Sequence, residues 1–245
     1  MSENELLTPP EPRQPIFRAP AVVPLLIGVL LTIHAGLWLA GQDWQIWALY
    51  AFSFIPARLG GGTPIPMIPG SQAWSFLTYA FLHANAAHVL FNSLWLLIFG
   101  TVVARYLGAL RFLLLSSLSA IGGALATLAL HWGEGVIVVG ASGAVSGLMA
   151  AAVPVMYGRG MRWGTPLAGD PHYAQPLPFG GLLHHRGALI FMVIFVIITL
   201  LSGATGYLGN SFVPGSTIAW EAHLGGFATG LAGFYVLANG ASSRT

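Results

Sequence analysis

The hydrophobic pattern of the chain is a series of long apolar blocks separated by polar stretches that are rich in Gly and Pro. The blocks cover residues 21–40, 87–106, 112–132, 142–157, 188–204 and 219–238. Each is close to the roughly 20 residues that an α-helix needs to cross a bilayer, and the fourth block is the shortest. The pattern predicts an all-α, polytopic membrane protein, built as a bundle of six transmembrane helices.

Composition supports a membrane protein. Hydrophobic residues make up 56% of the chain and charged residues only 7%, whereas soluble domains carry about 25% charged residues. The chain has no cysteine, which excludes disulfides, a thiol nucleophile and a zinc–thiolate site. Its few basic residues form no nucleic-acid patch. We therefore expect the lipid bilayer as a partner and no nucleic acid, and the sequence leaves the oligomeric state open.

The chain divides into a membrane domain and two short tails. Residues 1–19 are polar and rich in proline, with acids that a transit peptide would lack. This stretch is predicted to be a disordered cytoplasmic tail. Residues 20–240 form the membrane domain, and residues 241–245 form a second short cytoplasmic tail.

The arginines predict the orientation of the bundle. With a cytoplasmic N-terminus, only Arg58 falls on the outer side. The cytoplasmic set is then Arg13, Arg18, Arg105, Arg111, Arg159, Arg162, Arg186 and Arg244. This bias follows the positive-inside rule and predicts that both termini are cytoplasmic. It also places Ser142 and His223 at matching depth near the outer surface.

Two connections between the blocks are long. The outer one, residues 41–86, is rich in aromatics that include Trp44, Trp47 and Trp74. Because tryptophan favours the headgroup zone, we expect an element lying in the membrane interface there. The inner one, residues 158–187, is rich in Gly and Pro and is predicted to be a solvated connector.

Ser142 and His223 are the strongest candidates for catalysis. Polar groups at membrane depth are costly, so they mark functional sites by default. A serine and a histidine are also sufficient for nucleophilic catalysis, because the imidazole can take the hydroxyl proton during attack. Two simpler readings stay open: Ser142 is a helix N-cap, or Ser146, one turn deeper, is the nucleophile.

His88 and Asn92 are candidate oxyanion donors. Their i,i+4 spacing puts them on one helix face, at the depth of Ser142. Acyl transfer needs donors aimed at the oxygen that becomes negative, and the backbone N–H of Ser142 at a helix start is a further one.

Glycines permit the required approach of the fourth and sixth blocks, because Gly143 with Gly147 and Gly226 with Gly230 form small-xxx-small faces.

These motifs, in this order on the second, fourth and sixth blocks, resemble those of the rhomboid family of intramembrane serine proteases. They read His83, His88-x-x-x-Asn92, Gly140-x-Ser142-Gly143 and Ala222-His223-x-x-Gly226-x-x-x-Gly230, and the resemblance runs from about Trp74 to the end of the chain. It implies a rhomboid-like six-helix bundle.

The resemblance also implies an activity and the roles of individual residues. Ser142 would be the nucleophile and His223 the general base. His88, Asn92 and the Ser142 N–H would form the oxyanion hole, and His83 would support the outer loop. Substrates would be transmembrane proteins, cut near the outer membrane face without a cofactor. The expected location is a bacterial inner membrane.

The sequence departs from the family pattern at two places. Ser146 stands where rhomboids often carry Tyr or Phe, which stacks on the catalytic histidine. Ser75 follows Trp74 where many rhomboids have arginine. The first departure raises the question of how His223 is packed, and the second raises the question of how the outer loop is anchored.

Other functional classes fit less well. Zinc accepts three histidines, such as His83, His88 and His223, but no HExxH motif is present and Glu221 points off the helix face of His223. No metal is therefore predicted. A transporter would show two related halves, which are not visible. An inactive rhomboid-like binding or quality-control factor would lack the serine or the histidine, and both are present.

The outer-side acids give no clear third member of a triad. Asp43 and Glu134 are the outer candidates, and neither is placed by the sequence to orient His223. We therefore predict a dyad, with His131 in an interfacial role. Hydrolysis needs water, so we expect the polar site residues to line one cavity open to the outer face. The predicted substrate gate is block 188–204 with the loop 206–217.

Overall fold

The structure, a computed structural model, describes residues 19–60, 65–66, 68–159, 174–205 and 219–239. These residues form helices joined by loops. The described residues contain two isolated antiparallel β-bridges and no β-strand. The predicted all-α fold is confirmed.

Each apolar block of the sequence forms a helix. The helices are α1 (Val22–Ala40), α5 (Ala86–Trp95) continuing through η3 (Leu96–Gly100) into α6 (Thr101–Leu107), α7 (Ala109–Leu130), α8 (Ser142–Met156), α10 (Arg186–Thr205) and α12 (Trp220–Asn239). Four segments are long and apolar enough to cross a membrane: Val22–Ala40, Ala86–Leu107, Ala109–Leu130 and Arg186–Gly203. The chain is therefore an integral membrane protein. The count of six spans stays a prediction, because α8 and α12 are not among these four.

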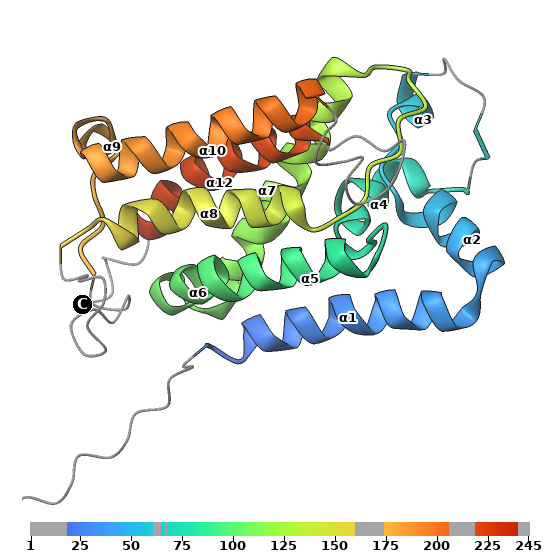
Figure 1. Cartoon of the computed structure of the whole chain (residues 1–245), viewed down its shortest axis with the longest axis horizontal. Helices are drawn as coiled ribbons and strands as arrows, with labels where there is room; N and C mark the ends of the chain where they lie inside the picture. Colours follow the sequence, from blue (N-terminus) through green and yellow to red (C-terminus); the bar gives the residue numbers. More distant parts are fainter. Residues whose placement is uncertain (1–18, 61–64, 67, 160–173, 206–218, 240–245) are drawn as a thin grey trace, which may run out of the picture.

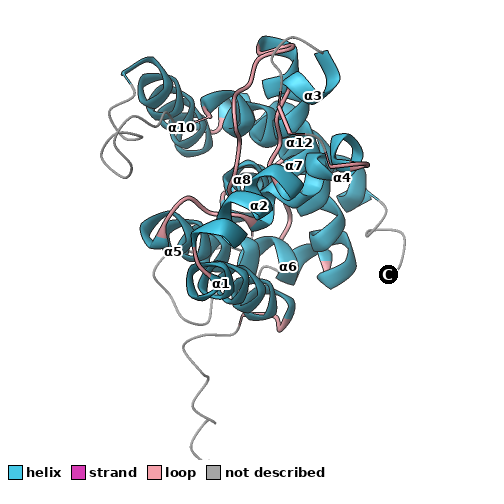
Figure 2. Ribbon diagram, turned by 90° about the vertical axis from the view of Figure 1, so that its right-hand side faces the viewer, coloured by secondary structure: helices cyan, strands magenta, loops and turns pink. Residues whose placement is uncertain are grey.

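The bundle is centred on α8 (Figure 2). The closest packing is of α12 against α7 and α8, and of α7 against α8. Helix α10 contacts α12, α8 and the short helix α9 (Phe179–His184). Its other face is apolar and open, with Ile190 57% and Leu201 56% exposed. In a membrane protein such a face contacts lipid.

The second block contains a π-helical turn, η3, between α5 and α6. Its residues Leu96, Phe99 and Gly100 are buried. A Cβ added at Gly100 would lie 3.0 Å from Leu96 Cδ1 and 3.3 Å from Phe112 Cε2 on α7. The turn therefore sits where the second block packs closely on its neighbour, and π-bulges of this kind are frequent near functional sites.

The long outer connection is largely helical. It contains α2 (Gln42–Phe52), α3 (Ala57–Gly60), α4 (Ser71–Thr78) and the 3₁₀ turn η2 (Tyr79–Phe81), gathered at the end of the bundle where α8 begins (Figure 1). Trp44 and Trp47 of α2 are 57% and 48% exposed. This arrangement fits the predicted interfacial element.

The inner connection is described only in part, because residues 160–173 lie outside the described residues. The described remainder contains α9. The prediction of a plain connector was therefore incomplete. Two glycines inside this short helix gave no helical signal in the sequence.

Arg58 anchors the outer connection. Its buried guanidinium donates to the carbonyl of Ser53 at 2.5 Å and to the carbonyl of Tyr50. Trp74 Nε1 donates to the carbonyl of Ala51 at 2.7 Å. Buried backbone carbonyls are costly to leave unpaired, so these bonds hold the loop without an arginine after Trp74. The sequence had assigned Arg58 only a topological role.

The described arginines separate along the bundle. Arg105 lies at the end of α6, Arg111 at the start of α7, Arg159 after α8 and Arg186 at the start of α10. Arg58, on α3, lies at the opposite end (Figure 1). Basic residues therefore concentrate at the end of the bundle opposite Ser142.

Candidate active site

Ser142 is the first residue of α8, and its hydroxyl has no hydrogen-bond partner among the residues that the structure describes. Ala141 occupies the N-cap position. Within the described part of the chain, Ser142 Oγ makes no hydrogen bond, and its side chain is partly exposed. Ser146, one turn deeper, is 4% exposed. The geometry does not support the reading of Ser142 as a cap, and it favours Ser142 over Ser146 as the accessible hydroxyl.

The two residues before Ser142 are held by the second block and its outer loop. The N–H of Gly140 donates to the carbonyl of Tyr79 at 3.0 Å, and the N–H of Ala141 donates to His83 Nε2 at 3.3 Å. Gly140 has φ 118°, and a Cβ there would lie 2.6 Å from His88 Nε2. Only glycine combines this φ with such a close approach. His83 thus supports the backbone that leads into Ser142.

His88 is fixed from three sides. Its N–H donates to Asn85 Oδ1 at 2.8 Å, which caps α5, and its carbonyl accepts from Asn92 Nδ2 at 3.0 Å. Its ring meets the His83 ring edge to face, with centroids 5.0 Å apart. Asn92 is 5% exposed, and since an amide nitrogen carries two protons, one stays available for another acceptor.

Helices α8 and α12 touch through their backbones. A Cβ added at Gly226 would lie 2.1 Å from the carbonyl oxygen of Gly143, and one at Gly230 would lie 2.2 Å from Gly147 Cα. No larger residue could occupy these positions without separating the helices. The contact carries His223, one turn before Gly226, toward the start of α8.

The structure brings the candidate residues into one region without joining all of them. The carbonyl of Ala222, the residue before His223, lies against the first turn of α8, since a Cβ added at Gly143 would be 3.3 Å from its oxygen. Among the described residues, no hydrogen bond links Ser142 to His223. Catalytic hydrogen bonds are often long in unliganded enzymes and tighten with substrate. The dyad is therefore supported by the contact between its helices and remains a proposal.

Tyr79 is a site residue that sequence reasoning missed. It is 1% exposed, and its hydroxyl donates to the carbonyl of Ala120 at 2.8 Å. A Cβ added at Gly143 would lie 2.8 Å from this hydroxyl. The Tyr79 hydroxyl therefore packs against the first turn of α8, and the Tyr79 carbonyl accepts the N–H of Gly140. The sequence signal was a single tyrosine in an apolar run, which identifies no partner.

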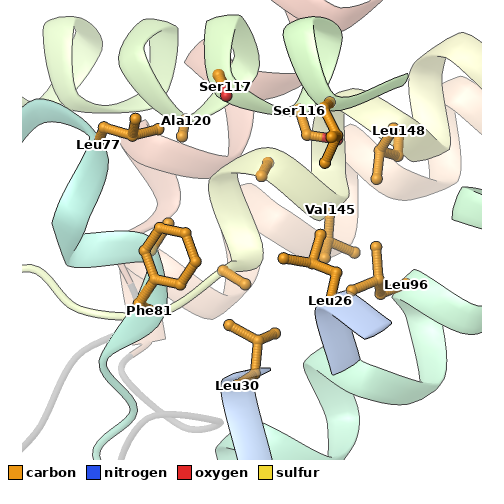
Figure 3. A pocket seen from close by; sticks show the side chains of 14 residues that line it. Leu26, Leu30, Leu77, Phe81, Leu96, Ser116, Ser117, Ala120, Val145 and Leu148 are labelled. Carbon is orange, nitrogen blue, oxygen red and sulfur yellow. The ribbon is translucent and has the colours of Figure 1, made fainter. Parts of the chain in front are cut away.

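Two cavities flank this region. One, of about 80 Å³, is lined by aliphatic and aromatic side chains such as Leu30, Phe81 and Val145 (Figure 3). Ser116, at its wall, already donates to the carbonyl of Phe112 at 2.8 Å. Apolar cavities of this kind stay dry.

The second cavity, of about 500 Å³, lies between α1, α2 and the start of α5, and it is polar enough to hold water. Its polar lining comes from His34, Gln45, His83 and Asn85. Of the polar residues expected to line one cavity, His83 and Asn85 line this one, whereas His88, Asn92, Ser142 and His223 do not. The expectation that all six share one cavity stays a prediction. The predicted gate loop 206–217 lies outside the described residues.

No group of three potential ligand side chains among the described residues has the geometry to hold a metal ion. His83 Nε2 already accepts the N–H of Ala141, which removes that nitrogen from a zinc site with His88 and His223.

Residues 70–240, from the start of α4 through α12, match the family model of the Rhomboid domain. The chain belongs to the rhomboid family. The rhomboid protease GlpG of Klebsiella pneumoniae is 29% identical over 201 residues, covering 79% of this chain and 62% of GlpG. RHOMBOID-like protein 4 of Arabidopsis thaliana is 29% identical over 180 residues, covering 73% of this chain and 38% of the plant protein.

The rhomboid protease GlpG of Yersinia pseudotuberculosis is 28% identical over 160 residues, covering 65% of this chain and 46% of GlpG. This rhomboid chain thus spans less than two thirds of the length of these relatives. The predicted resemblance to the family is confirmed.

Proposed function

We propose that this rhomboid is an intramembrane serine endopeptidase that cleaves transmembrane proteins near the outer membrane face with a Ser142–His223 dyad. Two observations together carry the proposal. The Ser142 hydroxyl has no hydrogen-bond partner among the described residues, and the backbones of α8 and α12 are in contact at Gly143 and Gly226. Relatives named as rhomboid proteases support the reaction class.

The reaction follows from the chemistry of these groups. His223 takes the proton of Ser142 Oγ as the oxygen attacks the carbonyl carbon of the substrate peptide bond. The Ser142 N–H, His88 and Asn92 donate to the oxyanion of the tetrahedral intermediate. His223 then gives its proton to the leaving amine. Water attacks the acyl-enzyme with His223 again as base, and the acid product leaves with Ser142 restored.

We further propose the orientation of the chain. The arginines of the described residues concentrate at the end of the bundle opposite Ser142, and basic loops stay on the cytoplasmic side. The site then opens to the outer face of a bacterial inner membrane, and both termini are cytoplasmic. The mechanism needs no cofactor.

The test is active-site labelling of the full chain in detergent micelles. A fluorophosphonate probe should form one covalent adduct, and peptide mass spectrometry should locate it on Ser142. A catalytically inactive family member would give no adduct under conditions where a control rhomboid protease reacts, and that result would contradict the proposal. An adduct on Ser146 would move the nucleophile by one turn.

His88→Ala and Asn92→Ala should each reduce cleavage without abolishing it. Loss of one oxyanion donor costs about 3–4 kcal/mol in soluble serine proteases, a fall of several hundredfold in kcat. The Ser142 N–H still stabilises part of the charge, so residual activity is expected. Steady-state cleavage of a transmembrane substrate in micelles measures this effect. Unchanged kcat in both variants would assign the two residues to packing alone.

A further inference from the structure

His131 lies between two carboxylates at the outer end of the bundle. Its Nε2 is 2.6 Å from Glu221 Oε1, and its Nδ1 is 2.8 Å from Glu134 Oε2. The two acids differ in burial, since the side chain of Glu221 is 7% exposed and that of Glu134 is 57% exposed. The sequence had assigned His131 only to the interface.

These three residues come from elements that meet at the site. His131 follows the last residue of α7, and Glu221 lies in the first turn of α12, two residues before His223. Glu134 follows α7 in the loop to α8, and its carbonyl accepts the N–H of Ala57 at 2.9 Å. The ion pair therefore joins α7 to the start of the helix that carries His223.

The backbone next to Glu221 is tightly enclosed. A Cβ added at Gly123 of α7 would lie 2.7 Å from the carbonyl oxygen of Ala222, and one at Gly143 of α8 would lie 3.3 Å from that same oxygen. Ala222, between Glu221 and His223, is thus wedged between the helix of His131 and the helix of Ser142. Glu221 and His223 therefore lie on the same enclosed first turn of α12.

We propose that the His131–Glu221 pair is a positioning clasp that holds the outer end of α12 and so aims His223 at Ser142. This inference rests on the proposed protease function. Neither residue of the clasp touches the reacting atoms. Both act by fixing the backbone on which the general base is mounted.

Charge links the clasp to pH. The pKa of His131 is raised above its usual range, mostly by the hydrogen bond to Glu221 and to a smaller extent by the one to Glu134. Helix α3 packs beside residues 132–133, and its charged residue is Arg58. The Arg58 guanidinium donates to the carbonyls of Ser53 and Tyr50 and not to the two carboxylates. His223 is the other titratable group at this end of α12. His131 therefore faces two acids and no competing cation among the described elements around it.

The protonated imidazole donates to both carboxylates, whereas the neutral ring has a single N–H and directs a lone pair at one of them. Because the folded-state pKa of His131 is raised, the clasp is complete below the ordinary histidine pKa. It weakens as the pH rises through the raised pKa of His131. The rate of the enzyme should therefore fall on an alkaline limb set by His131.

The experiment compares Glu221→Gln with the matched control Glu134→Gln in the full chain, reconstituted in micelles. Fluorophosphonate labelling of Ser142 and cleavage of a transmembrane substrate are followed across pH, together with Tm. Glu221→Gln should move the alkaline limb to lower pH and lower kcat about tenfold at neutral pH, because small misplacement of a catalytic group is costly. Glu134→Gln should move the limb less, since an exposed pair is screened.

Several outcomes separate the possibilities. Active variants whose pH profiles superimpose on the wild type overturn the clasp, as does a lower Tm with an unshifted limb. If Glu221→Gln fails to fold, His131→Gln takes its place and should lose the alkaline limb, because the imidazole whose titration sets that limb is removed. A wild-type chain that labels at no pH contradicts the protease function itself.

Discussion

Ser142→Ala should abolish cleavage, with a fall in kcat of about 10⁶-fold, the scale seen when the nucleophile or base of a serine protease is removed. His223→Ala should have a similar effect, and the double variant should be no worse, because the two groups act as one unit. Tm should stay unchanged for Ser142→Ala, since the hydroxyl makes no hydrogen bond within the described residues. Cleavage of a transmembrane substrate and thermal unfolding in micelles measure both effects.

Ser146→Ala is the matched control, one turn along the same helix and buried. It should retain activity. Full activity in Ser142→Ala, together with loss in Ser146→Ala, would assign the nucleophile to Ser146. Full activity in both variants would contradict serine catalysis by α8.

Gly230→Ala should separate α8 from α12. The added methyl would lie 2.2 Å from Gly147 Cα and 2.3 Å from its carbonyl oxygen, so backbone must move rather than a flexible side chain. Overpacking of this kind costs about 1–3 kcal/mol. Because α12 carries His223, activity should fall steeply as well. Thermal unfolding in micelles and the cleavage rate are the two measurements.

Gly36→Ala, on α1, is the matched control. A Cβ at Gly36 meets nothing within 4 Å, and alanine favours a helix over glycine by about 1 kcal/mol. This variant should therefore be as stable as the wild type or slightly more stable. Equal Tm and equal activity in Gly36→Ala and Gly230→Ala would show that the helix contact tolerates expansion, contrary to the structure.

The sequence alone predicted most of the helical framework, because the information for an apolar helix is local. The fourth block was predicted to begin at Ser142, and α8 begins there. The glycine faces were also readable, since a small residue repeated every four positions has meaning without knowledge of its partner. The structure adds which glycines meet, with Gly143 against Gly226 and Gly147 against Gly230.

The sequence could not predict which polar residues far apart in the chain are in contact. Glu221 contacts His131, which lies 90 positions away in the chain. Likewise, the hydroxyl of Tyr79 bonds a carbonyl 41 positions away. The sequence explained Arg58 as a topology signal and did not predict its hydrogen bonds to the carbonyls of the outer loop. Residue type and spacing define a donor or an acid, and only the packed chain defines its partner.

The π-helical turn at Leu96–Gly100 divides the second block into two helical halves. The side chains of the second half are rotated about the helix axis relative to those of a continuous α-helix. Each residue of an α-helix advances the side chain by about 100°, so one additional residue in a turn reorients everything beyond it. His88 and Asn92 lie on the outer half, before the turn. A one-residue gap in an alignment across this turn would therefore represent a change in helix winding, and His88 and Asn92 would keep their original face.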